Sequence, residues 1–231
     1  MSLAFQSLLL GVGQLRDPAV LRVLGKSLAI SLAVFALLGV LLFGGLSAAL
    51  ASAGLQSGAA ETWLVTVILM ILAMWFLFRV VALAVLQFFA DEIVQAVERK
   101  HYPGIAQQAR KLPFQEDLAN SVKSVGRAVL FNLLALPVAL LLLFTAIGPA
   151  VVFLLVNAVL LGRELTDMAW LRHRPDHTAT IPVGTGQRLI LGGLVAGLML
   201  IPFVNLLAPV IGAAAGTHMV HIRREMAGPN A

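Results

Sequence analysis

The sequence predicts an all-α integral membrane protein with two long transmembrane helices, two re-entrant helical hairpins and interfacial helices. Three observations predict this. The chain is 60% hydrophobic and only 12% charged, against about 25% charged residues in a soluble domain. Four long stretches lack charge almost completely, and the basic residues gather between them. Without a soluble-type linker, residues 1–231 are expected to form a single membrane domain with a short polar tail over 223–231.

The first two uncharged stretches predict full spans, since a transmembrane helix needs about 20 apolar residues. The first long helix is expected over 27–50 and the second over 62–90. The second is expected to continue until Pro103-Gly104 ends it. Its extension has helical periodicity, with an apolar stripe of Ile93, Val94 and Val97 and a polar set of Asp91, Glu92, Gln95, Glu98 and Arg99.

The last two uncharged stretches predict hairpins, because residues that break helices divide them. Gly148-Pro149 divides 128–162 and leaves a second arm of about 13 residues, and IPFVN at 201–205 leaves arms over 189–201 and 206–218. A helix of about 13 residues reaches about 20 Å, which is shorter than a bilayer core of about 30 Å. Such arms are expected to enter the membrane and return, with their turns shielded by protein or water.

The basic residues support this topology. Apart from Arg79, Lys and Arg occur in 1–26, 99–127, 163–188 and 223–231, and the 51–61 loop has none. Two spans and two hairpins place every basic segment on one side. Four full spans would instead place 163–188, with its four arginines, outside. The positive-inside bias favours the first arrangement.

Several function classes have no supporting pattern. The chain contains no Cys, P-loop, G-x-S-x-G, zinc-protease or kinase motif, so we expect no enzyme and no cofactor. Scattered basic residues with little aromatic interleaving argue against nucleic-acid binding. His218 and His221 lie three apart and could share a metal, but Glu225 is the only acid near them in sequence, and we expect no metal site.

Two places are candidates for binding an anion. Arg79 is the only charged residue inside a hydrophobic span, and such residues are often functional. Asp17 and Pro18 suit a helix start. The free amides that follow, beginning at Ala19, could bind an anion together with Arg22. An ordinary capped helix is the alternative for this segment, and structural pairing is the alternative for Arg79.

The charged segment 162–175 has two interpretations. Arg163 and Asp167 are spaced to pair on a helix. Trp170 suits a membrane interface, and 172–174 form a basic end. The segment is either a solvated interfacial helix that grips headgroups, or Glu164 or Asp167 faces the bundle and lines a transport route. Asn157 and Asn205, in apolar stretches, are expected to bond across helices or cap broken ones, and are included as pathway candidates.

The order of these features resembles one family. The chain has a helix start at LRDPAVLR, two long helices, FFADEIVQAVERKHYPG, a hairpin around IGP, NAVLLGRELTD and a closing LMLIPFVNLLAPVIGAAAGTHMV. Together, over about residues 8–222, they resemble the CysZ sulfate-permease family, which is grouped with the etoposide-induced membrane proteins. The resemblance implies two spanning helices, two hemi-penetrating hairpins, homo-oligomers and sulfate uptake for cysteine synthesis across the bacterial inner membrane.

The chain departs from the family pattern at its motifs. The family's Arg-Pro-Gly-x-Arg-Arg helix start keeps only Pro18 and Arg22, and Asp17 adds a negative charge there. Of the family's Pro-Phe-Asn only Phe89 remains, and of its Tyr-x-Asp-Tyr-Pro only Asp167. The leading hypothesis is a transporter or channel for a small inorganic anion, sulfate first, with the lipid bilayer as its other partner. The alternative is a non-transporting membrane scaffold or assembly protein of the same fold.

Overall fold

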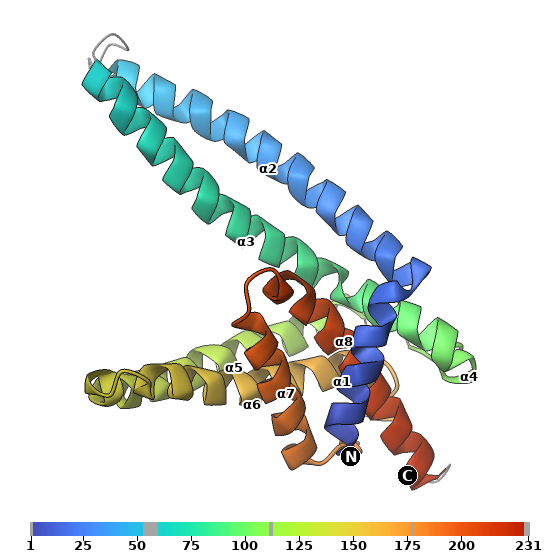
Figure 1. The fold of residues 1–231 in the computed structure, drawn as a ribbon. Helices are drawn as coiled ribbons and strands as arrows, with labels where there is room; N and C mark the ends of the chain where they lie inside the picture. The colour runs from blue at the N-terminus through green and yellow to red at the C-terminus, as the bar shows by residue number, and fades with distance from the viewer. Residues whose placement is uncertain (1, 53–59, 111–112, 177, 229–231) are drawn as a thin grey trace. The chain divides into compact units, whose positions relative to one another are not determined.

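The computed structural model describes residues 2–52, 60–110, 113–176 and 178–228, and every regular element within these ranges is helical (Figure 1). This confirms the all-helical membrane fold expected from the sequence. The elements are α1 (Leu3–Gly13), η1 (Gln14–Arg16), α2 (Pro18–Ser52), α3 (Ala60–His101), α4 (Pro103–Ala106), α5 (Phe114–Leu141), η2 (Leu142–Phe144), α6 (Gly148–Trp170), α7 (Thr185–Met199) and α8 (Val204–Ala227).

The chain forms two compact units. Unit 1 combines Met1–Leu21 with Ala90–Ala231, and unit 2 is Arg22–Phe89. Within unit 2, α2 and α3 approach closely at Gly39, where a Cβ atom would lie 3.1 Å from the Met74 methyl group. Unit 1 holds all the clusters of polar side chains described below.

The second long helix lies close to its predicted range, but the first begins at Pro18 and not at residue 27, because the helix start at Asp17-Pro18 leads directly into the apolar span. Asp17 is extended, and its side chain accepts a hydrogen bond from the Ala19 amide (2.7 Å), so it caps α2 from just before Pro18. The second long helix continues to His101, and a new helix starts at Pro103. Its stripe of Ile93, Val94 and Val97 is buried as expected.

Both pairs of helices form around the predicted breaks, but the arms of the α5–α6 pair are longer than the sequence suggested, and each is long and apolar enough to cross a membrane. The break falls at Gly148, where an added Cβ would lie 2.4 Å from Thr145 Oγ1. The second arm does not stop after about 13 residues. It continues through the charged segment to Trp170 as a helix of 23 residues, or about 34 Å. The predicted length is wrong because charged side chains do not interrupt helical hydrogen bonding and therefore do not end the arm.

The α7–α8 hairpin turns at the predicted IPFVN segment. Helix α7 ends at Met199, α8 starts at Val204, and Phe203 between them has a positive φ of 66°. The expected arm over 206–218 was too short, because α8 extends to Ala227 through Arg223 and Arg224. A positive φ is strained for a side chain of this size, which marks the turn as tightly constrained.

The core of unit 1 lies around α8. Every residue from Ala208 to His221 is buried, because α1, α6 and α7 all pack against this helix. Figure 1 shows α1 beside α8, so the first and last helices of the chain are neighbours. Small residues allow the close approach: a Cβ on Gly11 would lie 2.6 Å from the Ile211 carbonyl oxygen.

Both units contain helices that suit lipid. Helices Pro18–Gly45, Leu118–Phe144 and Gly148–Trp170 are long and apolar enough to cross a membrane, among the residues described. The most apolar stretch of Leu118–Phe144 has no buried residue. Phe144, at the hairpin turn, is 95% exposed. Apolar surface of this extent requires a bilayer or another apolar partner.

Candidate functional site

Three arginines and two acids from three helices form one group, here named the arginine–carboxylate cluster. Its members are Arg127 on α5, Arg163, Glu164 and Asp167 on α6, and Arg188 on α7. The predicted Arg163–Asp167 pair is confirmed, with Arg163 Nε 3.3 Å from Asp167 Oδ2. Arg188 donates to the other oxygen of Asp167, Oδ1, at 3.2 Å. Asp167 therefore holds two arginines, one of which the sequence did not indicate.

Two glycines explain why α7 can deliver Arg188 to this position. A Cβ on Gly162 would lie 1.9 Å from the Arg188 carbonyl oxygen, and one on Gly192 would lie 2.0 Å from the Ala158 carbonyl oxygen. The α6 and α7 backbones therefore touch directly, as small residues allow between membrane helices. The contact places Arg188 beside the first charged turn of α6.

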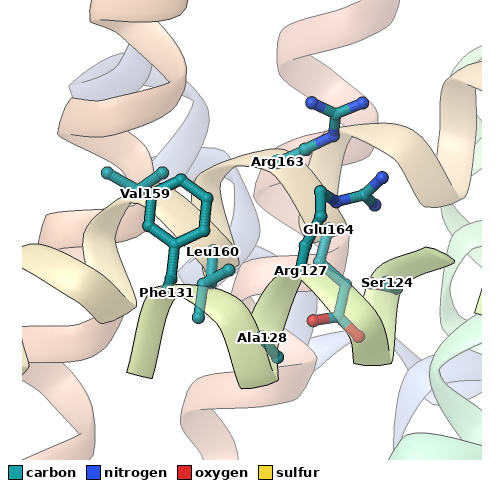
Figure 2. A pocket seen from close by; sticks show the side chains of 8 residues that line it. All are labelled: Ser124, Arg127, Ala128, Phe131, Val159, Leu160, Arg163 and Glu164. Atoms are coloured by element: carbon teal, nitrogen blue, oxygen red, sulfur yellow. The ribbon is translucent and has the colours of Figure 1, made fainter. Parts of the chain in front are cut away.

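A pocket of about 80 Å³ lies between α5 and α6 within the cluster. Figure 2 shows its lining. The Glu164 carboxylate reaches toward Ala128 and Ser124 of α5, and the Arg127 and Arg163 guanidinium groups lie above that carboxylate in the view. The apolar wall is Phe131, Val159 and Leu160. A cavity of this measure exceeds the 10–15 Å³ that one water needs, so it has room for a small polyatomic ion.

Arg127 differs from the other two arginines of the cluster in its distance from the carboxylates. It lies close enough to Glu164 and Asp167 to interact with both charges. Within the described part of the chain it makes no ion pair at 4.0 Å or less. The cluster carries three positive and two negative formal charges, which leaves one positive charge beside the pocket.

A second polar group, the histidine–glutamate cluster, consists of Glu98, His173 and His221. His173 Nε2 and His221 Nε2 lie 2.8 and 3.2 Å from Glu98 Oε1. An ionised carboxylate can only accept, so both nitrogens carry protons and donate. Burial raises the pKa of Glu98, but the hydrogen bonds from His173 and His221 and the nearby charges outweigh it and lower the pKa to about 2.

This cluster changes the interpretation of 172–174. The side chains of Arg172, His173 and Arg174 are only 18%, 2% and 12% exposed, so they do not form a solvated basic end. Arg172 and His173 face Glu98, and Arg174 pairs with Glu116 of α5. Contacts with acids that are distant in sequence keep these three side chains largely buried. Trp170 is likewise buried, with Arg224 over its ring at 5.9 Å from the centroid.

A chain of hydrogen bonds extends from His218. The Gln14 amide nitrogen, a double donor, lies 2.8 Å from His101 Nε2 and 3.1 Å from His218 Nε2. Both imidazole nitrogens therefore accept. The remaining proton of neutral His218 is on Nδ1 and donates to the Tyr102 hydroxyl oxygen at 2.9 Å. Sequence spacing paired His218 with His221, whereas the structure gives each its own hydrogen-bond partners.

Residues 7–209 match the family model described as "Sulfate transporter CysZ/Etoposide-induced protein 2.4". The chain belongs to this family. Comparison with curated proteins and with solved structures gives no match. The matched range includes the whole arginine–carboxylate cluster, but it ends before His218 and His221.

The helix start of this CysZ-family chain differs from a free anion site. The Ala19 amide donates to Asp17, and Asp17 also forms an ion pair with Lys100 of α3. Arg22 follows Pro18 by about one turn of α2. The first amide predicted to bind an anion therefore already binds a carboxylate, whose charge would repel an approaching anion.

The other predicted residues lie apart from the clusters or outside the described side chains. Arg79 lies within α3, and its side chain is outside the described residues. Asn157 does not use its amide nitrogen to bridge helices. That nitrogen donates to the Phe153 carbonyl of its own helix at 2.8 Å. Asn205 lies in the first turn of α8, directly after the break.

Proposed function

We propose that this protein carries a small inorganic anion, sulfate first, across the bacterial inner membrane. Family membership supports a transport function. The observation that carries the proposal is the pocket beside Arg127 and Arg163, where three arginines outnumber two acids. Guanidinium groups bind oxyanions through paired, charge-assisted hydrogen bonds. No residue is assigned a catalytic or cofactor-binding role.

The charged residues have distinct roles in this proposal. Arg127 supplies the main contact to the anion. Asp167 holds Arg163 and Arg188 in place, and Glu164 gates the pocket by competing with the anion for Arg127. An acid next to the site also weakens binding, which favours release on the far side.

The residues outside the cluster keep the roles that the sequence suggested for them. Arg22 attracts the anion without the Ala19 amide, which already donates to Asp17, and Arg79 provides a second contact within the membrane. Asn157 and Asn205 lie along the route as neutral hydrogen-bonding groups. Homo-oligomers complete the proposal, since the exposed apolar face of α5 suits a second copy as well as lipid.

Uptake of labelled sulfate into proteoliposomes tests the proposal, with protein-free vesicles as the control. Arg127→Gln is expected to lower uptake about 10-fold or more, because a hydrogen bond to a charged group contributes about 1.5–3 kcal/mol. Lys123→Gln is the matched control on α5: Lys123 is exposed and outside the pocket lining, so uptake should be unchanged. Arg79→Leu should abolish uptake but leave membrane insertion intact.

Equal uptake by wild type and Arg127→Gln would contradict the role of Arg127. No uptake above protein-free vesicles, from wild type shown to be folded, would contradict sulfate transport.

The second candidate function is a non-transporting membrane scaffold. Asp17 favours it, because this residue caps α2 and pairs with Lys100 where the family pattern has a cation. Stabilisation by ligand separates the two functions: only a folded protein that binds the anion is stabilised by it. A midpoint of thermal unfolding that rises with sulfate but not with chloride at equal ionic strength supports transport. An unchanged midpoint supports the scaffold.

A further inference from the structure

Three side chains far apart in sequence meet inside unit 1. Glu98 comes from the end of α3, His173 from the turn after α6, and His221 from α8. Their side chains are 1%, 2% and 0% exposed. One donor atom from each lies within 4.8 Å of the other two. Polar groups this buried need a bonding partner that compensates for the free energy lost when water is removed from them.

The hydrogen bonds of this cluster leave one carboxylate oxygen unused. Both imidazole Nε2 atoms point at Glu98 Oε1. Glu98 Oε2 is buried and has no hydrogen-bond partner among the described residues. The nearest cation, Arg172, keeps its Nη2 atom 3.8 Å away, which is too long for a hydrogen bond. A buried unsatisfied polar atom costs about 1–3 kcal/mol, and a bound ion is one way to satisfy it.

We propose that Glu98, His173 and His221 bind a divalent transition metal of the zinc class. Two imidazole nitrogens and one carboxylate are ligands that Zn²⁺ accepts, with a fourth position left for water. Binding requires each imidazole to carry its proton on Nδ1 instead of Nε2, so that Nε2 offers its lone pair to the ion. Bonds of about 2.0–2.2 Å in a tetrahedron separate ligand atoms by about 3.4 Å. The two Oε1–Nε2 distances, 2.8 and 3.2 Å, are slightly shorter, so small outward shifts admit the ion beside Oε1. The unpartnered Oε2 atom is then the second oxygen of the same carboxylate and can bind the ion as well.

The proposed ion would cross-link three elements of unit 1 and is independent of anion transport. Glu98 is separated from His173 by 75 residues and from His221 by 123. Metal bound only by the assembled cluster stabilises the folded chain by mass action. Arg172 opposes binding, because its positive charge competes for the same carboxylate. Arg172→Gln should therefore raise the affinity for zinc.

The test uses the full chain in detergent, without a polyhistidine tag, stripped of metal by a chelator and dialysed against ZnCl₂. Elemental analysis should find about one zinc per chain, and zinc should raise the midpoint of thermal unfolding. Glu98→Gln keeps the shape and the hydrogen-bond acceptor but removes the charge. Its affinity should fall at least about 100-fold, because loss of an outer hydrogen-bond partner alone costs about 10–100-fold. The matched control is His101→Gln, which changes an exposed histidine outside the cluster and should still bind one zinc.

Zinc absent from the dialysed wild type, or bound equally by Glu98→Gln and His101→Gln, would overturn the proposal. Zinc-edge X-ray absorption of the loaded wild type decides the matter without any variant. Two imidazole ligands support the assignment, and any other number refutes it.

Discussion

At the scale of single residues, Asp17 joins local and long-range structure. Its Oδ1 atom accepts from the Ala19 amide and its Oδ2 atom pairs with Lys100, 83 residues later in the chain. The hydrogen bond from Lys100 is the main cause that lowers the pKa of Asp17 below 3.8, and the bond from Ala19 adds to it. One carboxylate thus fixes the start of α2 and binds it to the end of α3.

The lowered pKa predicts how stability depends on acid. Below pH 3.8 the unfolded chain protonates Asp17, while the folded protein must give up its ion pair to do so. The contribution is complete above pH 3.8 and is lost as the pH falls through the lower, folded-state pKa. Thermal unfolding measured from pH 5 downward should show a smaller acid-induced loss in Asp17→Asn, which keeps a capping acceptor, than in wild type.

Asp17→Ala separates the cap from the charge. Its free energy of unfolding should be about 1 kcal/mol lower than that of Asp17→Asn at every pH, as expected for a missing N-cap. Identical acid profiles for wild type and Asp17→Asn would show that the Lys100 pair does not stabilise the fold.

Local chemistry in the sequence identified some of these residues and missed others. Asp17 and the Arg163–Asp167 pair follow from spacing along one helix. The contact of Glu98 with His173 and His221 depends on tertiary packing, which no local pattern reports. One signal was present: Glu98 follows Val94 by four residues, so helical periodicity places it on the buried face.

At the scale of helices, the α6–α7 contact positions the arginine–carboxylate cluster. Gly162 and Gly192 allow the two backbones to touch, and Arg188 on α7 thereby reaches Asp167 on α6. The distance between α6 and α7, rather than the charges themselves, decides whether Arg188 and Asp167 can form an ion pair.

Adjacent glycines on α7 provide a matched test. In Gly192→Ala the new Cβ would lie 2.0 Å from the Ala158 carbonyl oxygen, whereas in Gly193→Ala it would lie 3.6 Å from the Ala158 Cβ, an ordinary contact. Overpacking costs about 1–3 kcal/mol or more, so Gly192→Ala should lower the unfolding midpoint. Gly193→Ala should leave the unfolding midpoint unchanged or raise it, because Ala is more favourable than Gly inside a helix by about 1 kcal/mol. Equal midpoints for both variants would refute the close contact.

Helix positions followed from the sequence more reliably than helix lengths. Pro103, Gly148 and the 201–205 segment mark real breaks, because the backbone leaves the helical region at Tyr102, Thr145 and Phe203. Charged residues do not mark helix ends at α6 and α8, which is why the predicted arms are too short. Arg163 and Arg223 continue their helices, since charge affects solvation and not the hydrogen bonds of the backbone.

At the scale of the whole molecule, the charge distribution predicts the orientation of the chain. With two spans and two re-entrant hairpins, Ser47 and Thr178 lie on opposite sides of the membrane. The chain has no cysteine, so Ser47→Cys and Thr178→Cys each provide a unique thiol. A membrane-impermeant maleimide should label one variant in intact cells and the other only in inverted vesicles. Labelling of both from one side would instead indicate four full spans.

The pairing of α1 with α8 has a consequence for the order of synthesis. About 190 residues separate the end of α1 from the start of α8, and at about 5–20 residues per second translation of this interval takes on the order of 10–40 s. During that time α1 has emerged but its partner does not exist. Unit 2 is complete long before unit 1, which closes only when the final helix leaves the ribosome.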